Sequence, residues 1–261
     1  MPATLASVHI ESIREAADKL KNVALRTPIQ HNQRLSDKFD CDIYLKREDL
    51  QIVRSYKIRG AYNKISSLSQ EELAKGIVCA SAGNHAQGVA YACKTLNVKG
   101  RIYMPIVTPK QKIDQTKFFG QECIEVELVG DTYDDSYEAA QSYSRDRGAT
   151  FVHPFDDLQT IAGQATVGLE IVEDGPKDID YIIVAIGGGG LASGVLSTLA
   201  HLSPNTKLIG VEPAGAPAML ESINQGELVT LKEVDTFVDG AAVQIVDRPF
   251  GRREWRLREC G

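Results

Sequence analysis

One short stretch of the sequence decides the class of fold. Residues 181–191 read Tyr-Ile-Ile-Val-Ala-Ile-Gly-Gly-Gly-Gly-Leu, an apolar run that passes directly into four glycines. An apolar run of this length is typical of a buried strand, and a helical stretch follows it through Leu202. A flexible linker would not lie between a buried strand and a helix, so the glycines predict a loop that folds closely around a phosphate.

The same order of strand, turn and helix recurs along the chain. Strands are predicted at Asp42–Lys46, Ile77–Ala80, Arg101–Met104, Cys123–Leu128, Thr150–His153, Tyr181–Ile186 and Lys207–Val211. Amphipathic stretches lie between most of them, for example Ala86–Leu96, Lys110–Phe119, Tyr133–Arg147 and Gln159–Val172. Strands that alternate with helices predict βαβ units, and therefore an α/β fold with mostly parallel sheets.

Composition excludes several classes of protein. The 261 residues are 43% hydrophobic and 25% charged, with a formal net charge of −6, which is ordinary for a globular protein but wrong for a non-specific nucleic-acid binder. No apolar run approaches the roughly 20 residues that span a bilayer, so we expect no membrane partner. The five cysteines are widely spaced without a C-x-x-C motif, which favours reduced thiols in a cytoplasmic protein.

A second loop that could carry chemistry is Arg54–Ala61, which contains Lys57. Ser55 is a good N-cap and would place Lys57 in the first turn of a helix. A cation there faces the positive end of the helix dipole, which favours the neutral amine that a Schiff base requires. From these eight residues alone, a solvated surface lysine is the more common alternative.

A third loop, Ser81–Gly88, follows a predicted strand and opens a helix. This arrangement binds anions because backbone N–H groups converge at the helix N-terminus, and a carboxylate is a natural guest. Plain helix capping by Ser81 or Asn84 is the alternative. His85 has no second histidine or carboxylate at ligand spacing, so we expect no metal site.

The glycine loop also has a rival interpretation. Gly187-x-Gly189-x-x-Ala192 fits the dinucleotide fingerprint, and Glu212 stands about where a ribose partner is expected. That fingerprint usually belongs to the first βα turn of its unit, whereas several βα units precede it here. We therefore favour a phosphate loop, and a nicotinamide-dependent oxidoreductase remains the alternative at this point.

Taken together, the motifs resemble the fold type II (tryptophan-synthase-β-like) pyridoxal-phosphate enzymes, and most closely the threonine dehydratase and serine dehydratase/racemase branch. The matching segments, in the family's order, are 46–51 (KREDLQ), 55–61 (SYKIRGA), 81–88 (SAGNHAQG), 153–157 (HPFDD), 187–191 (GGGGL) and 238–242 (VDGAA). Several motifs in the right order are more specific than any one alone, so Lys57 becomes the expected Schiff-base lysine.

The resemblance implies two three-layer α/β domains with the cofactor between them. The smaller domain, 50–145, would be inserted into a larger one made of 1–49 and 146–246. The resemblance ends at about Val246, so we expect the C-terminal part of the family fold to be missing and 247–261 to be an atypical basic tail. The family's partner for the pyridine nitrogen is not found in this chain.

The resemblance also implies a role for individual residues. Lys57 would bind pyridoxal 5'-phosphate as a Schiff base and then act as the base, and Asn84 would hydrogen-bond the ring hydroxyl oxygen. The phosphate would be held by backbone N–H groups of Gly187, Gly188, Gly189, Gly190 and Leu191. The substrate carboxylate would be held by Ser81, Gly83, Asn84 and His85.

The implied reaction is a threonine dehydratase (threonine ammonia-lyase) reaction, in a cytoplasmic homo-oligomer. L-threonine would give 2-oxobutanoate and ammonia, towards isoleucine, with L-serine as a possible second substrate. Serine dehydratase, serine racemase and a non-catalytic fragment are the alternatives. The racemases carry a second serine where this chain has Ala82, and a second acidic cation ligand where it has only Glu212. Both differences favour a dehydratase without a metal ion.

Overall fold

The computed structural model describes residues 8–235, 237–238 and 240–246. Its helices are α1 (Ile10–Leu20), α2 (Gln33–Phe39), α3 (Lys57–Ser66), α4 (Gln70–Lys75), α5 (Asn84–Leu96), α6 (Lys110–Gly120), α7 (Tyr133–Arg147), α8 (Leu158–Asp174), α9 (Gly190–Leu202) and α10 (Ala218–Gln225), with short 3-10 helices η1 (Glu48–Leu50) and η2 (Gln121–Cys123). Its strands are β1 (Ile29–His31), β2 (Tyr44–Lys46), β3 (Ile77–Ala80), β4 (Gly100–Met104), β5 (Ile124–Leu128), β6 (Thr150–Phe151), β7 (Tyr181–Ala185) and β8 (Lys207–Val211).

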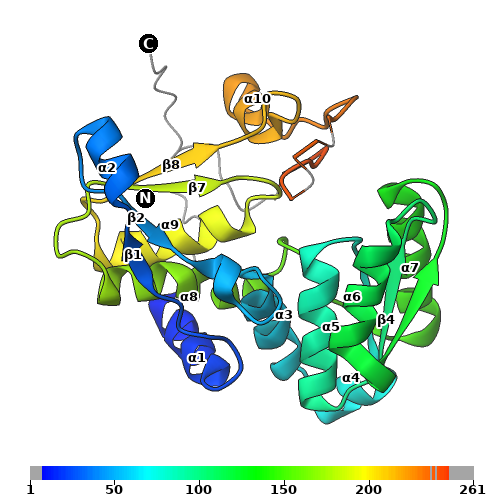
Figure 1. Cartoon of the computed structure of the whole chain (residues 1–261). Helices are drawn as coiled ribbons and strands as arrows, with labels where there is room; N and C mark the ends of the chain where they lie inside the picture. Colours follow the sequence, from blue (N-terminus) through cyan, green and yellow to red (C-terminus); the bar gives the residue numbers. More distant parts are fainter. Residues whose placement is uncertain (1–7, 236, 239, 247–261) are drawn as a thin grey trace, which may run out of the picture.

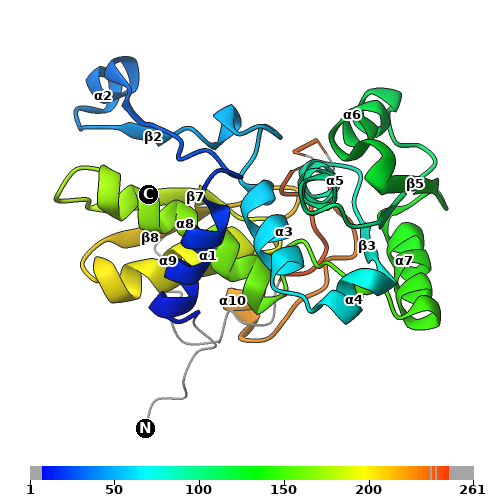
Figure 2. The same ribbon diagram turned by 90° about the horizontal axis from the view of Figure 1, so that it is seen from below.

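The first lobe is built on a parallel sheet in the order β5-β4-β3-β6. Side chains of β3 alternate between its faces: Ile77 and Cys79 pack into the cluster that includes α5, whereas Val78 and Ala80 pack into the cluster that includes α7. Helices therefore cover both faces of this sheet (Figure 2), which is why β3 is buried at every position.

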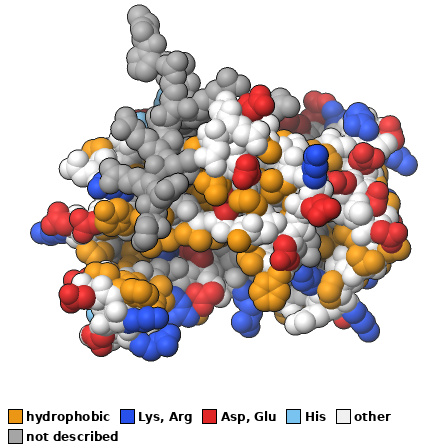
Figure 3. Space-filling view, turned by 90° about the horizontal axis from the view of Figure 1, so that it is seen from above, with side chains coloured by type: hydrophobic (Ala, Val, Ile, Leu, Met, Phe, Trp, Pro, Cys, Tyr) orange, Lys and Arg blue, Asp and Glu red, His pale blue; other side chains and the backbone are white. Residues whose placement is uncertain are grey.

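The second lobe contains β7 and β8, which pair in parallel over α9 and α8 (Figure 1). Ile182 packs against Val195 of α9, whereas the opposite face carries the exposed side chains of the two strands. On that face Ile183, 67% exposed, pairs with Ile209. Figure 3, a view from above, shows hydrophobic side chains gathered on this side of the molecule. Among the described residues, this small sheet is covered on one face only.

Helix α3 packs closely against both α8 and α5, and a glycine lies at each of the two contacts. A Cβ on Gly163 of α8 would lie 2.3 Å from the carbonyl oxygen of Arg59, and one on Gly88 of α5 would lie 3.0 Å from the carbonyl carbon of Lys57. The first distance excludes a side chain, so glycine is required at Gly163, whereas a Cβ on Gly88 would be accommodated only if the backbone at Lys57 shifted. The packing of α5 and α8 therefore fixes where α3 begins.

The expected α/β class with mostly parallel sheets is confirmed, and each predicted strand is present with bounds shifted by a few residues. Sequence patterns did not predict β1, a short strand that pairs antiparallel with β2. The expected division at residues 50 and 145 stays a prediction, while the sheet that begins at β3 continues to β6. The expected tail, 247–261, lies outside the described residues. None of the helices in the described part of the chain has the length and apolarity needed to cross a membrane.

Candidate active site

Lys57 is the first residue of α3 and so lies in its first turn, as predicted. Its Nζ donates a hydrogen bond to the carbonyl oxygen of Pro154 at 2.9 Å, and burial lowers its pKa to about 8. The amine is therefore neutral in an appreciable share of molecules near neutral pH. The expected N-cap was wrong: Tyr56 holds the cap position, and the buried hydroxyl of Ser55 has no partner. The helix begins one residue later than Ser55 would have set.

The glycine loop connects β7 to α9 and fits a phosphate group. Gly189 has a φ of +97°, which L side chains rarely adopt, and it stands directly before the first turn of α9. A Cβ on Gly188 would lie 2.2 Å from the ring of Phe155. The loop is therefore backbone only, at a helix N-terminus whose N–H groups have no partner within the helix. Such a cradle suits a phosphate and excludes side chains.

Lys57 and the glycine loop meet through two consecutive residues. The carbonyl of Pro154 accepts from Lys57, and the ring of the next residue, Phe155, lies against Gly188. Phe155 is itself held edge-on by the ring of His153, with 4.7 Å between ring centroids. The structure thus brings the expected amine and the expected phosphate loop to neighbouring residues of one short segment.

The loop before α5 is open at its tip. The N–H of Ser81 continues the pairing of β3 by donating to Tyr103, and the hydroxyl of Ser81 accepts from the N–H of Gly83. Gly83 holds the cap position of α5 without a side-chain cap bond, and a Cβ there would meet nothing within 4 Å. Asn84 is exposed. The alternative of capping by Ser81 or Asn84 is therefore wrong, and the N-terminus of α5 stays free for an anion.

His85 belongs to the same loop, but its side chain is buried. Its Nε2 donates to the carbonyl of Val152 at 2.9 Å, and Nδ1 has no partner. Burial, with the nearby charge of Lys57 as a smaller cause, lowers the pKa of His85 to about 3, so the ring is neutral. With the imidazole engaged elsewhere, the backbone N–H of His85 is the group left for the carboxylate expected at this loop.

The dinucleotide alternative required Glu212 for a ribose. Both oxygens of this carboxylate accept backbone N–H groups at the start of α10, from Met219 and Leu220 at 2.8 Å each. Glu212 therefore caps a helix, and the dinucleotide interpretation loses its ribose partner. Among the described residues, no three side chains of His, Cys, Asp or Glu lie together in a way that could hold a metal ion.

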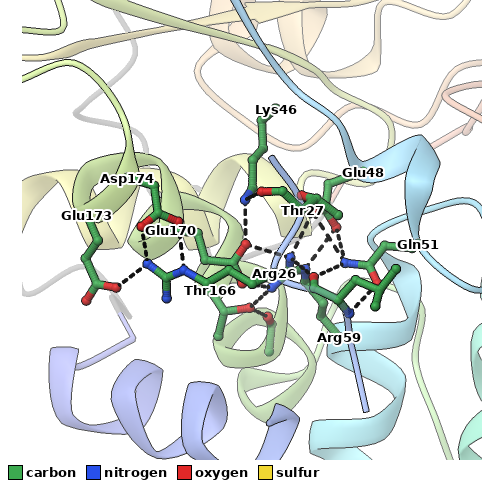
Figure 4. Close-up of polar contacts among 12 residues, drawn as sticks. Arg26, Thr27, Lys46, Glu48, Gln51, Arg59, Thr166, Glu170, Glu173 and Asp174 are labelled. Carbon is green, nitrogen blue, oxygen red and sulfur yellow. Dashed lines mark hydrogen bonds and ion pairs between the residues drawn. The ribbon is translucent and has the colours of Figure 1, made fainter. Parts of the chain in front are cut away.

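Sequence patterns did not predict the buried cluster of charged side chains beside α3, which Figure 4 shows. Arg59 is 1% exposed, and its guanidinium donates to Glu48 at 2.8 and 2.9 Å and to Glu170 at 2.6 and 2.9 Å. Lys46 donates to Glu170 at 2.5 Å and to the carbonyl of Thr27 at 2.7 Å. Two cations thus face two carboxylates. The signal available in the sequence was Glu170, an acidic residue inside the apolar stretch 159–172.

Comparison with known proteins gives the family to which this chain belongs. A family model described as pyridoxal-phosphate dependent enzyme matches residues 20–259, and the chain belongs to that family. The match runs past Val246, so the expected end of the resemblance there was wrong. The class of protein is therefore a pyridoxal-phosphate enzyme of the α/β fold described above.

Within this class, the chain is similar to curated proteins named L-threonine dehydratase biosynthetic IlvA. It is 56% identical to that of Halalkalibacterium halodurans over 94% of this chain and 60% of the relative, and 50% identical to that of Bacillus subtilis over 91% and 56%. The chain thus spans about three fifths of the length of these relatives.

Solved structures of related proteins have the same fold as this chain. The processed form of threonine deaminase isoform 2 from Solanum lycopersicum has a TM-score of 0.85 and 42% identity, covering 94% of this chain and 73% of that one. Maize serine racemase has a TM-score of 0.86 and 33% identity, covering 92% and 71%. The predicted fold type II architecture is therefore confirmed.

Replacing Glu170 tests the buried charge cluster. In Glu170→Leu, Arg59 and Lys46 lose a carboxylate that both need, and we expect the free energy of unfolding to fall by about 3–5 kcal/mol. Urea denaturation measures it. Glu71→Gln is the control, because Glu71 belongs to an exposed pair with Lys75 and its loss should have no measurable effect. Equal stabilities of the two variants would contradict this role.

The buried neutral ring of His85 predicts a loss of stability in acid. Its pKa is lower in the folded state than in the unfolded chain, so the unfolded state binds the proton first as pH falls below about 6.5. The free energy of unfolding should decline by up to about 1.4 kcal/mol per pH unit between pH 6 and pH 4. In His85→Gln this slope should flatten, whereas His201→Gln, at an exposed site, should keep it. An unchanged slope in His85→Gln would show that the ring does not titrate in this way.

Proposed function

We propose that this chain carries the active site of a threonine dehydratase (threonine ammonia-lyase), a pyridoxal-phosphate lyase that converts L-threonine to 2-oxobutanoate and ammonia, towards isoleucine. L-serine is the proposed second substrate. The observation that supports it most is the amine of Lys57, lowered in pKa and joined through Pro154 and Phe155 to the glycine loop. The similarity to biosynthetic L-threonine dehydratases supports the substrate.

The residues present fit the cofactor. Backbone N–H groups of Gly187–Leu191 would hold its phosphate, Asn84 would contact the ring hydroxyl oxygen, and the amine of Lys57 would bond to its aldehyde. When bound, pyridoxal phosphate supplies an electron sink for the negative charge left on Cα after proton loss. The buried residues around Lys57 exclude water from the amine, and this increases the share of molecules in which the amine is neutral and reactive.

The open N-terminus of α5 would hold the substrate carboxylate. The hydroxyl of Ser81 and the backbone N–H groups of Gly83, Asn84 and His85 lie at this end of the helix, where the dipole favours an anion. Binding there would fix the amino acid so that its Cα–H faces Nζ of Lys57, which would take that proton; the β-hydroxyl would leave with a proton, so that the elements of water are lost. Positioning of this kind is worth up to about 7–11 kcal/mol of the barrier.

The assembly is proposed to be a cytoplasmic homo-oligomer, in which residues 50–145 form a smaller domain within a larger one. Three of the four cysteines in the described residues are buried and all four are free thiols, in keeping with a reducing compartment. The open apolar face of β7 and β8 supports association, because exposed patches of this kind mark contact surfaces.

Chemical trapping tests the proposed function. The chain is mixed with pyridoxal phosphate, reduced with borohydride and digested, and mass spectrometry should find the label on Lys57. Release of 2-oxobutanoate from L-threonine is measured in parallel. Lys57→Ala should lose the label and the turnover, and Lys94→Ala, at an exposed site on α5, should keep both. A label on another lysine, or none, would contradict the assignment.

A serine racemase is the second candidate, because solved racemases from maize and Dictyostelium discoideum are 33% and 34% identical to this chain. The loop residue Ala82 distinguishes the two activities. In Ala82→Ser, a hydroxyl can reprotonate the other face of the substrate, and we expect the ratio of D-serine to pyruvate formed from L-serine to rise about tenfold or more. Chiral chromatography of the products measures it. D-serine as the main product of the unaltered chain would instead favour the racemase.

A further inference from the structure

Gln164 is a fully buried side chain of α8 that contacts three segments of the candidate site. Its Cγ lies 3.0 Å from where a Cβ would stand on Gly60, one turn after Lys57 in α3. Its Nε2 donates to the carbonyl of Pro154 at 3.1 Å. Its Oε1 lies 2.8 Å from where a Cβ would stand on Gly190, at the start of α9. The side chain of Gln164 therefore lies against the helix that carries Lys57, the Pro154 segment and the glycine loop.

Lys57 and Gln164 share a single acceptor. The carbonyl oxygen of Pro154 accepts from Nζ of Lys57 at 2.9 Å and from Nε2 of Gln164 at 3.1 Å. A carbonyl oxygen has two lone pairs, so both are occupied and the carbonyl is held in one orientation. The lysine stem is long and flexible, so the place of its nitrogen depends on the acceptor that it meets.

Stability alone does not explain a glutamine at this position. Its Oε1 is buried and has no hydrogen-bond partner, which is unfavourable. A methionine of similar shape would fill the same space without an unpaired acceptor. What the amide provides, and methionine does not, is the donor directed at Pro154.

We infer that Gln164 is a positioning residue, which orients the Pro154 carbonyl and thereby holds Nζ of Lys57 at a fixed place relative to the glycine loop. What this inference implies for the reaction rests on the proposed function. The titratable groups around Lys57 are Tyr56, His85 and His153, and none of the variants below replaces any of these three residues.

The test replaces Gln164 with methionine in the full chain. The thermal midpoint of Gln164→Met should be unchanged or higher, because a buried unpaired acceptor is removed. Reductive methylation of Lys57 by formaldehyde and cyanoborohydride, followed by peptide mass spectrometry against pH, should show a higher midpoint, because the ammonium form then has the carbonyl to itself. Trapping of pyridoxal phosphate on Lys57 should slow about tenfold or more, as expected for a misplaced reacting group.

Thr198→Val is the matched control. Thr198 is fully buried where α9 faces α8, and its hydroxyl donates to the carbonyl of Ala165 at 3.2 Å. Its loss removes a buried polar group near Gln164 without touching Pro154. We expect wild-type methylation and trapping at Lys57.

Gln164→Met that behaves as wild type in methylation and trapping would overturn the inference. If Gln164→Met lowers the thermal midpoint, Gln164→Asn is the deciding variant, because its shorter amide keeps the polarity but no longer reaches Pro154. Altered methylation and trapping at Lys57 in Gln164→Asn would support the positioning role. Wild-type methylation and trapping would overturn it. If the unaltered chain traps no pyridoxal phosphate, yet the methylation midpoint still moves in Gln164→Met, the proposed function fails and the positioning role stands.

Discussion

The close contact of α3 with α8 and α5 is the constraint on which the rest of the site depends. Gly163 lies so close to the carbonyl oxygen of Arg59 that there is no room for a side chain, and Gly88 lies against the backbone of Lys57, where a Cβ would fit only if that backbone shifted. Helices this close cannot shift without losing their packing. The first residue of α3 is therefore fixed by tertiary contacts on two sides, and the amine that it carries reaches the same place in every folded molecule.

Charge burial reinforces this constraint at the next residues of the helix. Arg59 is enclosed by Glu48 and Glu170, and Lys46 completes a balanced set of two positive and two negative groups. Removing such charges from water is unfavourable unless each meets an opposite charge in good geometry. The cluster thus accepts one arrangement of β2, η1, α3 and α8. Arg59 stands only two residues after Lys57 in α3, so this arrangement directly adjoins the lysine.

The sequence predicted those parts of the site that depend on local order. The run 181–191 predicted a strand, a glycine loop and a helix in the order that the structure has them, whereas the expected burial of the strand holds on one face only among the described residues. The position of Lys57 in a first helical turn was also readable. The cap at Ser55 was wrong, because the helix begins one residue later and the hydroxyl of Ser55 is buried without a partner. The Pro154 carbonyl and Gln164 could not be found either, since a backbone oxygen 97 residues from Lys57 in sequence gives no pattern.

The ionisation of Lys57 in the chain without cofactor tests this view of the site most directly. The rate of its reductive methylation, followed by peptide mass spectrometry between pH 6 and pH 11, gives the pKa of this one amine. Enclosure between α5 and α8 predicts a midpoint near 8. A midpoint near 10.5, the ordinary value for lysine, would mean that the amine is solvated and that the packing of α3 does not prepare it for chemistry.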